Sequence, residues 1–452
     1  MTETAVKKQS SKNRDSFASK WGFILACIGS VVGVGNIWMF PLRVSKYGGG
    51  SFLLPYFLFV TIIGFSGVIG EMAFGRATHS GPAGAFSKAF ASRGWNPKIG
   101  EFIGFIPVLG SLALAIGYSV VVGWILKYAA GSLLGFSWNF NGVSEFGASF
   151  GTMASAFGNT NWQLAGLAIA FFIMIFGISR GIEIANKIMI PLFFVMFVGL
   201  GVYISTLPGA IDGYKYILRV DPEMLKSPMV WAFALGQAFF SLSLAGNGTL
   251  IYGSYLKDDT DILNSAWRVA FFDTAAALIA ALVIIPAVAT AGENLSMGGP
   301  GLIFIYLPNL FKSMPFGRIV MIIFFISVFF AGITSLINLF EAPIATLQEK
   351  LSLSRHKAVT LVIGLGSLVG ISIQGIVGGW MDVVSVYVCP MGACIAGIMF
   401  FWVFGDDFVR RELQKGREKI IGAWLKPMTK YVFCGLTLIV IILSCTIPGG
   451  IG

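Results

Sequence analysis

The sequence predicts an all-α protein that crosses a membrane many times. Of its 452 residues, 56% are hydrophobic and only 12% are charged, whereas about 25% of the residues of a soluble globular protein are charged. Apolar runs of about 20 residues, long enough for a helix to cross the hydrocarbon layer, recur along the whole chain.

Eleven membrane spans are expected, and the ninth is short and rich in glycine. Two long polar loops, 130–161 and 207–228, are expected outside the membrane. The loop 293–316 contains the apolar run GPGLIFIYLPNLF. That run is too short to cross the membrane twice, so a re-entrant or capping element is expected there. The expected spans are 21–44, 51–74, 100–129, 162–178, 188–206, 229–255, 262–291, 317–347, 358–377, 380–405 and 431–449.

Basic residues indicate which side of the membrane is cytoplasmic. Cytoplasmic loops have an excess of lysine and arginine. Here these residues gather in the N-terminal tail, in the loop after span two and in the loop before the last span, whereas the loop after span nine has none. The N-terminus is therefore expected inside and, with an odd number of spans, the C-terminus outside. The net charge is +10, but the basic residues lie between the apolar spans, so no nucleic-acid partner is expected.

The first span contains residues that a helix built only to cross a bilayer would avoid. It includes the run GSVVGVGNIWMFP, with Gly33, Gly35 and the polar Asn36 in its middle. An internal glycine costs roughly 1 kcal/mol relative to alanine, and a buried polar group needs a partner. Span six is interrupted in the same way by the run AGNG at 245–248. Paired interruptions five spans apart indicate a transporter built from two inverted repeats.

This pattern divides the chain into two repeats of five spans and their connections. Backbone carbonyl groups freed at a helix break can coordinate Na⁺, and freed N–H groups can hold a carboxylate. The expected parts are a cytoplasmic tail (1–20), the first repeat (21–206), an extracellular loop (207–228), the second repeat (229–405), a cytoplasmic loop (406–430) and the last span with the C-terminus (431–452).

Several motifs resemble the neurotransmitter:sodium symporter family. GSVVGVGNIWMFP followed by YGGGSFLLPY is similar to the family's first-span signature, and the resemblance continues in order along nearly the whole chain. It implies the LeuT fold and Na⁺-coupled uptake of amino acids by alternating access. Eleven spans rather than twelve resemble the bacterial branch, which implies the inner (plasma) membrane of a bacterium. The further motifs are GEMAFGR, IGYSVVVGW, GISRGIEIANKIMIP, GQAFFSLSL, YLKDDTDI, FFAGITS and FFWVFG.

The resemblance implies a first sodium site between spans one, six and seven. Ser241 stands where the family has threonine or serine, and Asp273 stands where asparagine is more usual. An ionised Asp273 would add the negative charge that chloride supplies in many animal members, so no chloride is expected. Release of a proton from Asp273 to the inside on the return step is a further hypothesis. The implied ligands are the carbonyl of Val31 and the side chains of Asn36, Ser241 and Asp273.

A second sodium site is implied between spans one and eight, so two Na⁺ ions are expected. Its ligands are all oxygen and mostly neutral, which suits a hard monovalent cation. The motif AGITS indicates a sodium site only in combination with the matching residues of span one, because alone it would be ordinary helix packing. The implied ligands are the carbonyls of Gly29, Val32 and Ala331 and the hydroxyls of Thr334 and Ser335.

A substrate pocket is implied at the two breaks, with Tyr118 binding the substrate carboxylate and Phe240 forming an aromatic lid. Monoamine transporters have aspartate at the position of Gly29, so here an amino acid with its own carboxylate is expected. Gly246 replaces a large aromatic residue of some relatives and favours a bulky apolar or aromatic L-amino acid, although Val31 and Leu114 take up room. The expected lining is Ser30, Val31, Gly33, Gly35, Leu114, Tyr118, Phe240, Ser241, Ser243, Gly246, Ser335 and Leu339.

The outer gate departs from the family pattern. Met39 stands where the family has the arginine that pairs with an aspartate of span ten, while Asp382 remains near the expected place. The arginine of the charged latch is therefore missing. Trp38 and Phe240 are expected to close the pathway by packing, and Arg43, one turn further out, is an alternative partner for the latch.

The inner gate and a hinge are implied by further matches. Arg14 and Glu349 match the family's cytoplasmic salt bridge, with Tyr255 nearby. Exposed pairs contribute about 0–1 kcal/mol, which suits a latch that must open. Gly181 and Pro191 match the family's Gly-x₉-Pro pattern at the start of span five. Local unwinding there would let water reach the second sodium ion, and simple helix capping is the alternative.

Other interpretations have less support from the sequence. An enzyme is not expected, because there are only two histidines and no nucleophile motif or metal cluster. The five cysteines show no CxxC spacing, so neither a disulfide nor a metal site is expected. A transporter of a small zwitterion (taurine, glycine betaine or a small amino acid) and a non-transporting sensor on the same fold remain alternatives. The expected partners are an amino-acid substrate and the lipid bilayer, and a homodimer is left open.

Overall fold

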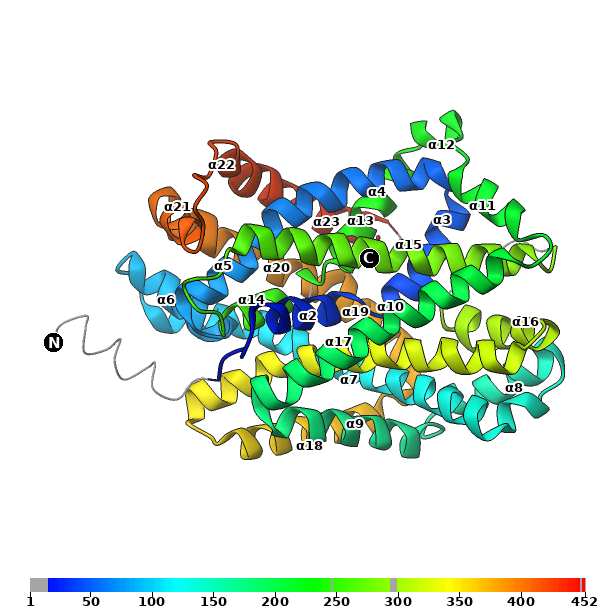
Figure 1. The fold of residues 1–452 in the computed structure, drawn as a ribbon. Coiled ribbons are helices and arrows are strands. Elements are labelled where there is room, and N and C mark those ends of the chain that lie inside the picture. The colour runs from blue at the N-terminus through cyan, green and yellow to red at the C-terminus, as the bar shows by residue number, and fades with distance from the viewer. Residues whose placement is uncertain (1–14, 245–246, 293–298, 448, 452) are drawn as a thin grey trace.

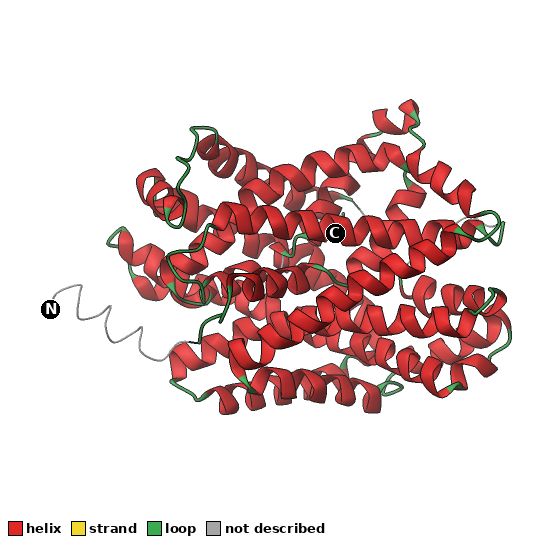
Figure 2. Cartoon of the chain, in the orientation of Figure 1, coloured by secondary structure: helices red, strands yellow, loops and turns green. Residues whose placement is uncertain are grey.

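The computed structural model describes residues 15–244, 247–292, 299–447 and 449–451, and the elements in these residues are all helices. Figures 1 and 2 show long helices lying side by side in one bundle, joined by short loops. The long helices α7 (Pro97–Leu134) and α17 (Gly317–Leu351) pack along each other in its interior. The predicted all-α architecture is confirmed.

The first half of the chain supplies five predicted spans, of which the first is bent. Three of them, spans one, two and five, contain a π-helical segment, a wider turn found often at functional sites. The elements are α2 (Lys20–Val31), η1 (Gly35–Met39) and α3 (Phe40–Lys46); α4 (Gly50–Ile63), η2 (Gly64–Val68) and α5 (Ile69–Thr78); α6 (Pro82–Ser92) and α7; α9 (Thr160–Ile175); and η4 (Ile178–Ile182) with α10 (Glu183–Ser205).

The second half supplies the remaining spans, and its first span is split into two pieces. The elements are α13 (Pro228–Ser241) and α14 (Gly248–Gly253); α15 (Ile262–Ala289); α17; α18 (Arg355–Ser372); η7 (Gln374–Ile376), α19 (Val377–Val383), η8 (Val384–Val388), α20 (Cys389–Ile398) and η9 (Met399–Val403); and α22 (Leu425–Pro427), η10 (Met428–Phe433) and α23 (Cys434–Thr446).

Three segments predicted as loops contain helices of their own. The run GPGLIFIYLPNLF forms a short buried helix, because its apolar side chains pack against the rest of the protein: Leu302, Ile303 and Phe304 are fully buried. The helices of these segments are η3 (Phe136–Asn139) and α8 (Gly142–Ala154), α11 (Ala210–Leu218) and α12 (Pro222–Lys226), and η6 (Leu302–Tyr306) with α16 (Leu307–Ser313).

Seven described helices are long and apolar enough to cross a membrane by length and composition, and an eighth is added if the bent first pair counts as one span. The other three predicted spans are shorter, interrupted or rich in glycine. The predicted boundary between spans nine and ten, at 377–380, is wrong. The first helix ends at Ser372 and the next begins at Gln374. The prediction missed this boundary because the glycines on both sides of it show no change from apolar to polar residues.

The described chain after the last span folds back into the bundle. Ile451 is fully buried, and its backbone lies against Gly236 of α13. Gly450 lies against Val386 of η8. Gly236 makes this approach possible, because a Cβ atom built there would lie 2.0 Å from the carbonyl oxygen of Ile451.

Substituting Gly236 with alanine is therefore expected to displace this segment, because no real Cβ approaches a carbonyl oxygen so closely. Hydrogen–deuterium exchange of the peptide that contains Ile451 should accelerate, while the helix content from circular dichroism stays unchanged. Gly435→Ala on the last span is the matched control, since a Cβ there would meet nothing within 4 Å. Equal exchange in Gly236→Ala and the parent protein would show that the segment is not held there.

Candidate sodium and substrate site

The two broken spans meet in the middle of the bundle. Span one leaves its helix at Val32, which has an extended backbone, and the two pieces of the span are bent by 54°. Span six leaves its helix at Leu242, and Ser243 has a left-handed φ of 53°. The Ser243 hydroxyl donates to the carbonyl of Ser30 at 2.9 Å. This contact joins the two breaks directly.

Three side chains of the predicted first sodium site lie together and are buried. The Asn36 amide nitrogen donates to Asp273 Oδ1 at 2.7 Å and to Ser241 Oγ at 3.3 Å, and Ser241 Oγ donates to Asp273 Oδ2 at 2.6 Å. Asp273 is fully buried, with no lysine or arginine among its hydrogen-bond partners in the described chain. A buried carboxylate without a positive partner is costly, and a bound cation would compensate it.

The donor set of this cluster fits a sodium ion. A carboxylate, a hydroxyl and backbone carbonyl groups are hard oxygen ligands, which hard cations prefer. The Asn36 side-chain oxygen now accepts from the backbone N–H of Gly33 at 3.2 Å. For this oxygen to face an ion, the amide would have to turn, and its present orientation satisfies the neighbours that surround it.

The predicted second sodium site also has its members in contact. Ser335 Oγ donates to the carbonyls of Gly29 and Val32, at 3.2 and 3.1 Å. The Thr334 hydroxyl contacts the carbonyl of Ala331 at 3.1 Å. Span one ends its first helix here, so the carbonyls of Gly29 and Val32 are directed to span eight instead of to the next helical turn. The five oxygen groups form a neutral set that suits a monovalent hard cation.

A cavity next to both clusters is lined by nearly the whole predicted substrate set. The Tyr118 hydroxyl accepts from the backbone N–H of Val34 at 3.1 Å. A Cβ at Gly33 would lie 2.9 Å from that hydroxyl, and a Cβ at Gly35 would lie 2.8 Å from the Phe240 ring, so neither position has room for a side chain. The lining residues are Ser30, Val31, Gly33, Gly35, Asn36, Leu114, Tyr118, Phe240, Ser241, Ser243, Ser335, Asn338, Leu339 and Met381.

One predicted lining residue is untested, and the cavity has lining residues that were not predicted. Gly246, on which the bulky-substrate argument rests, lies outside the described residues. Met381 of span ten and Asn338 of span eight line the cavity but were not predicted. Asn338 donates to the carbonyl of Gly248 at 3.3 Å, at the break of span six. Asn338 could have been predicted as a site residue, because it is a polar residue within the apolar span eight.

At the predicted outer gate, Arg43 pairs differently from the arginine of the family's latch. Arg43 is buried, and its guanidinium donates to Gln237 Oε1 of span six at 2.9 Å. Asp382 is exposed on α19, and no contact between described residues joins it to Arg43. Asp382 is therefore not a latch partner of Arg43 in this structure. Trp38 is half-buried, in the span that also provides Met39.

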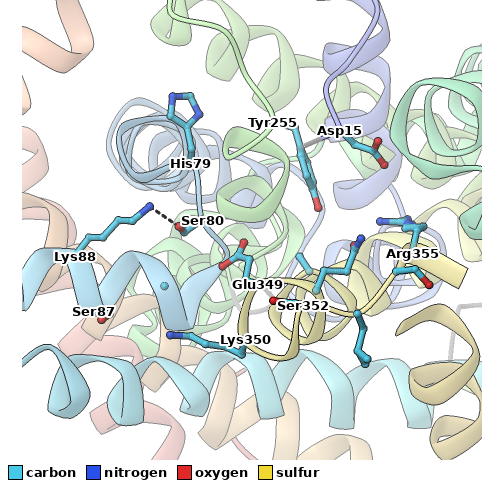
Figure 3. A pocket seen from close by; sticks show the side chains of 15 residues that line it. Asp15, His79, Ser80, Ser87, Lys88, Tyr255, Glu349, Lys350, Ser352 and Arg355 are labelled. Carbon is cyan, nitrogen blue, oxygen red and sulfur yellow. Dashed lines mark hydrogen bonds between the residues drawn. The ribbon is translucent and has the colours of Figure 1, made fainter. Parts of the chain in front are cut away.

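The region of the predicted inner gate has a polar cavity of about 900 Å³, shown in Figure 3, with Tyr255, Glu349 and Arg355 on its wall. Tyr255 donates to Glu341 Oε1 at 2.7 Å. Glu341 in turn makes a two-pronged ion pair with Arg355, at 2.6 and 2.7 Å. Glu349 accepts from the backbone N–H of Gly81 at 2.9 Å. Its predicted partner Arg14 lies outside the described residues.

The Glu341–Arg355 pair was not predicted. Glu341 is fully buried within α17, and the Arg355 side chain is 11% exposed at the start of α18. Paired charges that are taken out of water satisfy each other, so the pair fixes Tyr255 at the inner end of the pathway. An acidic residue inside an apolar span, Glu341, marked a functional candidate in the sequence. Its partner Arg355 lies on the next helix, so the pair itself could not be predicted.

The predicted hinge is helical in this structure. Gly181 lies in η4, and α10 continues unbroken through Pro191. A Cβ at Gly181 would lie 1.9 Å from the carbonyl of Ile173, so the glycine allows spans four and five to approach closely. At the same end of span five, Glu183 is buried and accepts from the N–H of Ala18 at 2.6 Å and from Ser19 Oγ at 2.8 Å.

A second unpredicted carboxyl group lies beside the break of span six. Glu71 of span two is buried, and the Thr249 hydroxyl donates to its Oε2 at 2.5 Å. The other carboxyl oxygen has no hydrogen-bond partner among the described residues. Because the motif GEMAFGR places this acid inside an apolar span, it could have been listed as a functional candidate.

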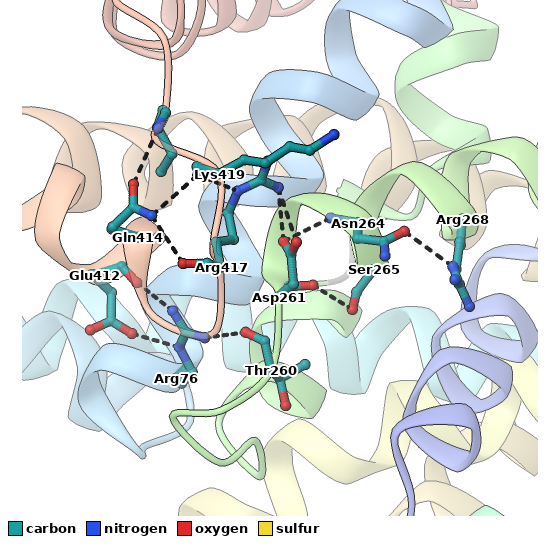
Figure 4. A network of polar contacts seen from close by, with 11 residues as sticks. Arg76, Thr260, Asp261, Asn264, Ser265, Arg268, Glu412, Gln414, Arg417 and Lys419 are labelled. Carbon is teal, nitrogen blue, oxygen red and sulfur yellow. Dashed lines mark hydrogen bonds and ion pairs between the residues drawn. The ribbon is translucent and has the colours of Figure 1, made fainter.

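A polar network ties span two to the loop before the last span (Figure 4). The fully buried Arg76 donates to Glu412 Oε1 at 2.7 Å and to the carbonyl of Thr260 at 2.6 Å. Glu412 belongs to α21 (Asp406–Gln414). Asp406 lies at the start of the same helix, and the Lys426 ammonium is 2.6 Å from its carboxylate. This ammonium lowers the pKa of the Asp406 carboxyl group below its usual value.

Comparison with known proteins identifies the family. The family model described as the sodium:neurotransmitter symporter family matches residues 14–149 and 139–448, most of the chain. The chain belongs to the sodium:neurotransmitter symporter family. The resemblance seen in the motifs is thereby confirmed, and so is the expectation of a transporter rather than an enzyme.

Relatives of this symporter are sodium-dependent transporters. It is 32% identical over 446 residues to an uncharacterised sodium-dependent transporter of Methanocaldococcus jannaschii, covering 93% of this chain and 88% of that protein. It is 25% identical over 485 residues to the sodium- and chloride-dependent taurine transporter of Rattus norvegicus, covering 94% of this chain and 76% of that protein.

A solved structure supports the fold. The crystal structure of MhsT in complex with L-phenylalanine matches with a TM-score of 0.85 and 32% identity, covering 96% of this chain and all of that one. The LeuT fold predicted for this symporter is thereby confirmed, although the count of eleven spans is not settled by the described helices.

Proposed function

We propose that this symporter takes up a bulky apolar or aromatic L-amino acid together with two Na⁺ ions, independently of chloride. The observation that supports it most is the buried cluster of Asp273, Asn36 and Ser241 beside the cavity where spans one and six are broken. No covalent chemistry is needed. The chain has to bind ions and substrate in one state and release them in another.

The substrate carboxylate would bind at the break of span one. The backbone N–H of Val34 donates to the Tyr118 hydroxyl, so the hydroxyl proton is free to be donated to a carboxylate. The positive end of the half-helix that begins at Gly35 adds attraction for a negative group. Gly29 has no acidic side chain, so it cannot form an ion pair with the ammonium group of a substrate that lacks its own carboxylate. An amino acid satisfies both conditions.

The side chain of the substrate would lie against apolar groups of three spans. Leu114 of span three, Phe240 of span six and Leu339 of span eight line the cavity, with Met381 of span ten. Methionine adapts its shape easily and contacts aromatic rings favourably. MhsT, of similar fold, is in complex with L-phenylalanine. These observations favour an aromatic or large aliphatic substrate.

Asp273 would supply the fixed negative charge at the first sodium site. Two Na⁺ ions and a zwitterionic amino acid bring a net charge of +2 into a buried place, and the Asp273 carboxylate lowers it to +1. A second anion such as chloride is then unnecessary. The inward membrane potential would assist uptake, at about 2.3 kcal/mol per charge per 100 mV.

A small zwitterion such as taurine is the second candidate. Val31 and Leu114 line the cavity and reduce its room, and the taurine transporter of Rattus norvegicus is a relative. Betaine and small amino acids belong to the same alternative. A sensor that binds substrate without transport is a third candidate, which binding without Na⁺-driven accumulation would support.

Localisation follows from the same arguments. We place the symporter in the plasma membrane of a bacterium, with the N-terminus inside and the C-terminus outside, because basic residues gather on one side of the expected spans. The cavity around Tyr255 and Glu349 then faces the cytoplasm.

Uptake into liposomes tests the proposal. Purified protein is reconstituted, and the twenty amino acids, taurine and betaine are compared with and without an inward Na⁺ gradient, in chloride and in gluconate. Accumulation of Trp, Phe, Tyr or Leu that needs Na⁺ but not chloride is the expected result. Uptake confined to taurine or betaine would reject the substrate class, and binding without accumulation would reject transport.

A further inference from the structure

Asn186 of span five has a buried side-chain oxygen that no hydrogen bond satisfies. The residue is fully buried in α10, and its amide nitrogen donates to the carbonyl of Ile182 at 2.8 Å. The amide oxygen has no hydrogen-bond partner among the described residues. A buried acceptor left without a partner is costly, so such a group in a native protein calls for an explanation.

The Asn186 side-chain oxygen lies against Gly29, a member of the second sodium cluster. A Cβ atom built on Gly29 would lie 1.9 Å from Asn186 Oδ1 and 3.0 Å from the Cβ of Thr334. Two atoms at these distances from one point can be at most 4.9 Å apart, so the Asn186 oxygen lies close to Thr334. Both Gly29 and Thr334 belong to the cluster. The absence of a side chain at Gly29 is what gives the amide access to it.

The chemistry of the amide oxygen matches that of the cluster. Side-chain amide and backbone carbonyl oxygens are ordinary ligands of hard cations. The five groups of the cluster come from spans one and eight, and a ligand from Asn186 would add a third span. A neutral oxygen would do so without changing the net charge of the buried site.

We propose that the Asn186 side-chain oxygen is a further ligand of the second sodium ion, supplied by span five. The proposal rests on the second sodium site proposed above. Asn186 lies between Gly181 and Pro191, the two residues of the predicted hinge. Unwinding of that segment toward the cytoplasm would therefore withdraw one ligand from the ion at the moment when water gains access. Release of the second sodium ion is thus coupled to span five.

Equilibrium binding of ²²Na⁺ to the purified protein, with thermal unfolding in K⁺ as a measure of folding, tests this. Asn186→Leu, which keeps the volume but removes the oxygen, is expected to weaken one class of sodium sites by about tenfold, which corresponds to about 1.4 kcal/mol. Asn186→Asp keeps an oxygen at this place and is expected to retain binding. Gln163→Leu removes another fully buried amide, on α9, and is expected to leave sodium binding unchanged.

The double variant separates this proposal from the one on which it rests. If Asn186 and Thr334 bind the same ion, Asn186→Leu adds little to the loss already caused by Thr334→Ala. Sodium binding unchanged in Asn186→Leu, with the loss in Thr334→Ala present, would overturn the role of Asn186 alone. Full additivity of the two losses would do the same. Unchanged binding in Thr334→Ala would overturn the second site itself, and this proposal with it.

Discussion

Replacing Asp273 with asparagine is expected to lower Na⁺-dependent uptake in gluconate medium by two to three orders of magnitude. The substitution keeps the shape of the side chain and removes one buried negative charge beside the first sodium site. Two unit charges about 4 Å apart interact by about 4 kcal/mol at the effective dielectric constant of a protein, which is nearly a thousandfold in affinity. The measurement is initial uptake rate against Na⁺ concentration in proteoliposomes.

Chloride provides the control for this substitution. If Asp273 replaces the anion, then chloride should restore part of the uptake by Asp273→Asn and should have no effect on the parent protein. Ser241→Ala removes a hydroxyl from the same cluster without changing its charge, so it should weaken Na⁺ binding less and gain no chloride dependence. An Asp273→Asn variant with parental Na⁺ dependence in gluconate would refute the proposed role of this carboxylate.

Replacing Glu412 with glutamine is expected to destabilise the folded protein strongly. It leaves the Arg76 guanidinium, which is fully buried, without a counterion. Removing one partner of a buried ion pair costs about 3–5 kcal/mol. Thermal unfolding of the purified protein in detergent should show a clearly lower midpoint, with faster proteolysis of the loop that contains α21.

Lys415 supplies the matched control for the same carboxylate. Its ammonium contacts Glu412 Oε2 at 2.7 Å, but its side chain is 41% exposed. Lys415→Gln should therefore change stability by only about 0–1 kcal/mol. A double variant, Arg76→Met with Glu412→Leu, should recover much of the loss, because no charge is then left buried. Equal midpoints for Glu412→Gln and Lys415→Gln would contradict the ion-pair account.

The sequence was informative where local chemistry determines the structure. Glycine and asparagine inside an apolar run predicted the breaks of spans one and six, because a helix in hydrocarbon tolerates such residues only where it lines a cavity. The resemblance then placed Tyr118 and Phe240 in the pocket and Asn36 beside Asp273, and the structure brings these residues together.

The sequence was less informative where partners lie on distant spans. Nothing around Glu341 indicates that Arg355 will reach it across the turn between two helices, and nothing around Asn186 indicates that it will face Gly29. The end of span nine was misplaced because glycine-rich helices lack apolar contrast. The return of Ile451 to Gly236 could not be anticipated either, since a single glycine gives no sign of what packs against it.

Equilibrium binding of one substrate tests whether the breaks of spans one and six form one site that binds substrate and Na⁺ together. The amino acid accumulated best in the liposome screen is bound to the purified protein while Na⁺ replaces K⁺ at constant ionic strength, in gluconate. No binding in K⁺ and a cooperative rise with Na⁺ are expected, because the ions and the substrate carboxylate share the breaks of spans one and six. Binding of equal affinity in K⁺ and Na⁺ would contradict a coupled site at these breaks.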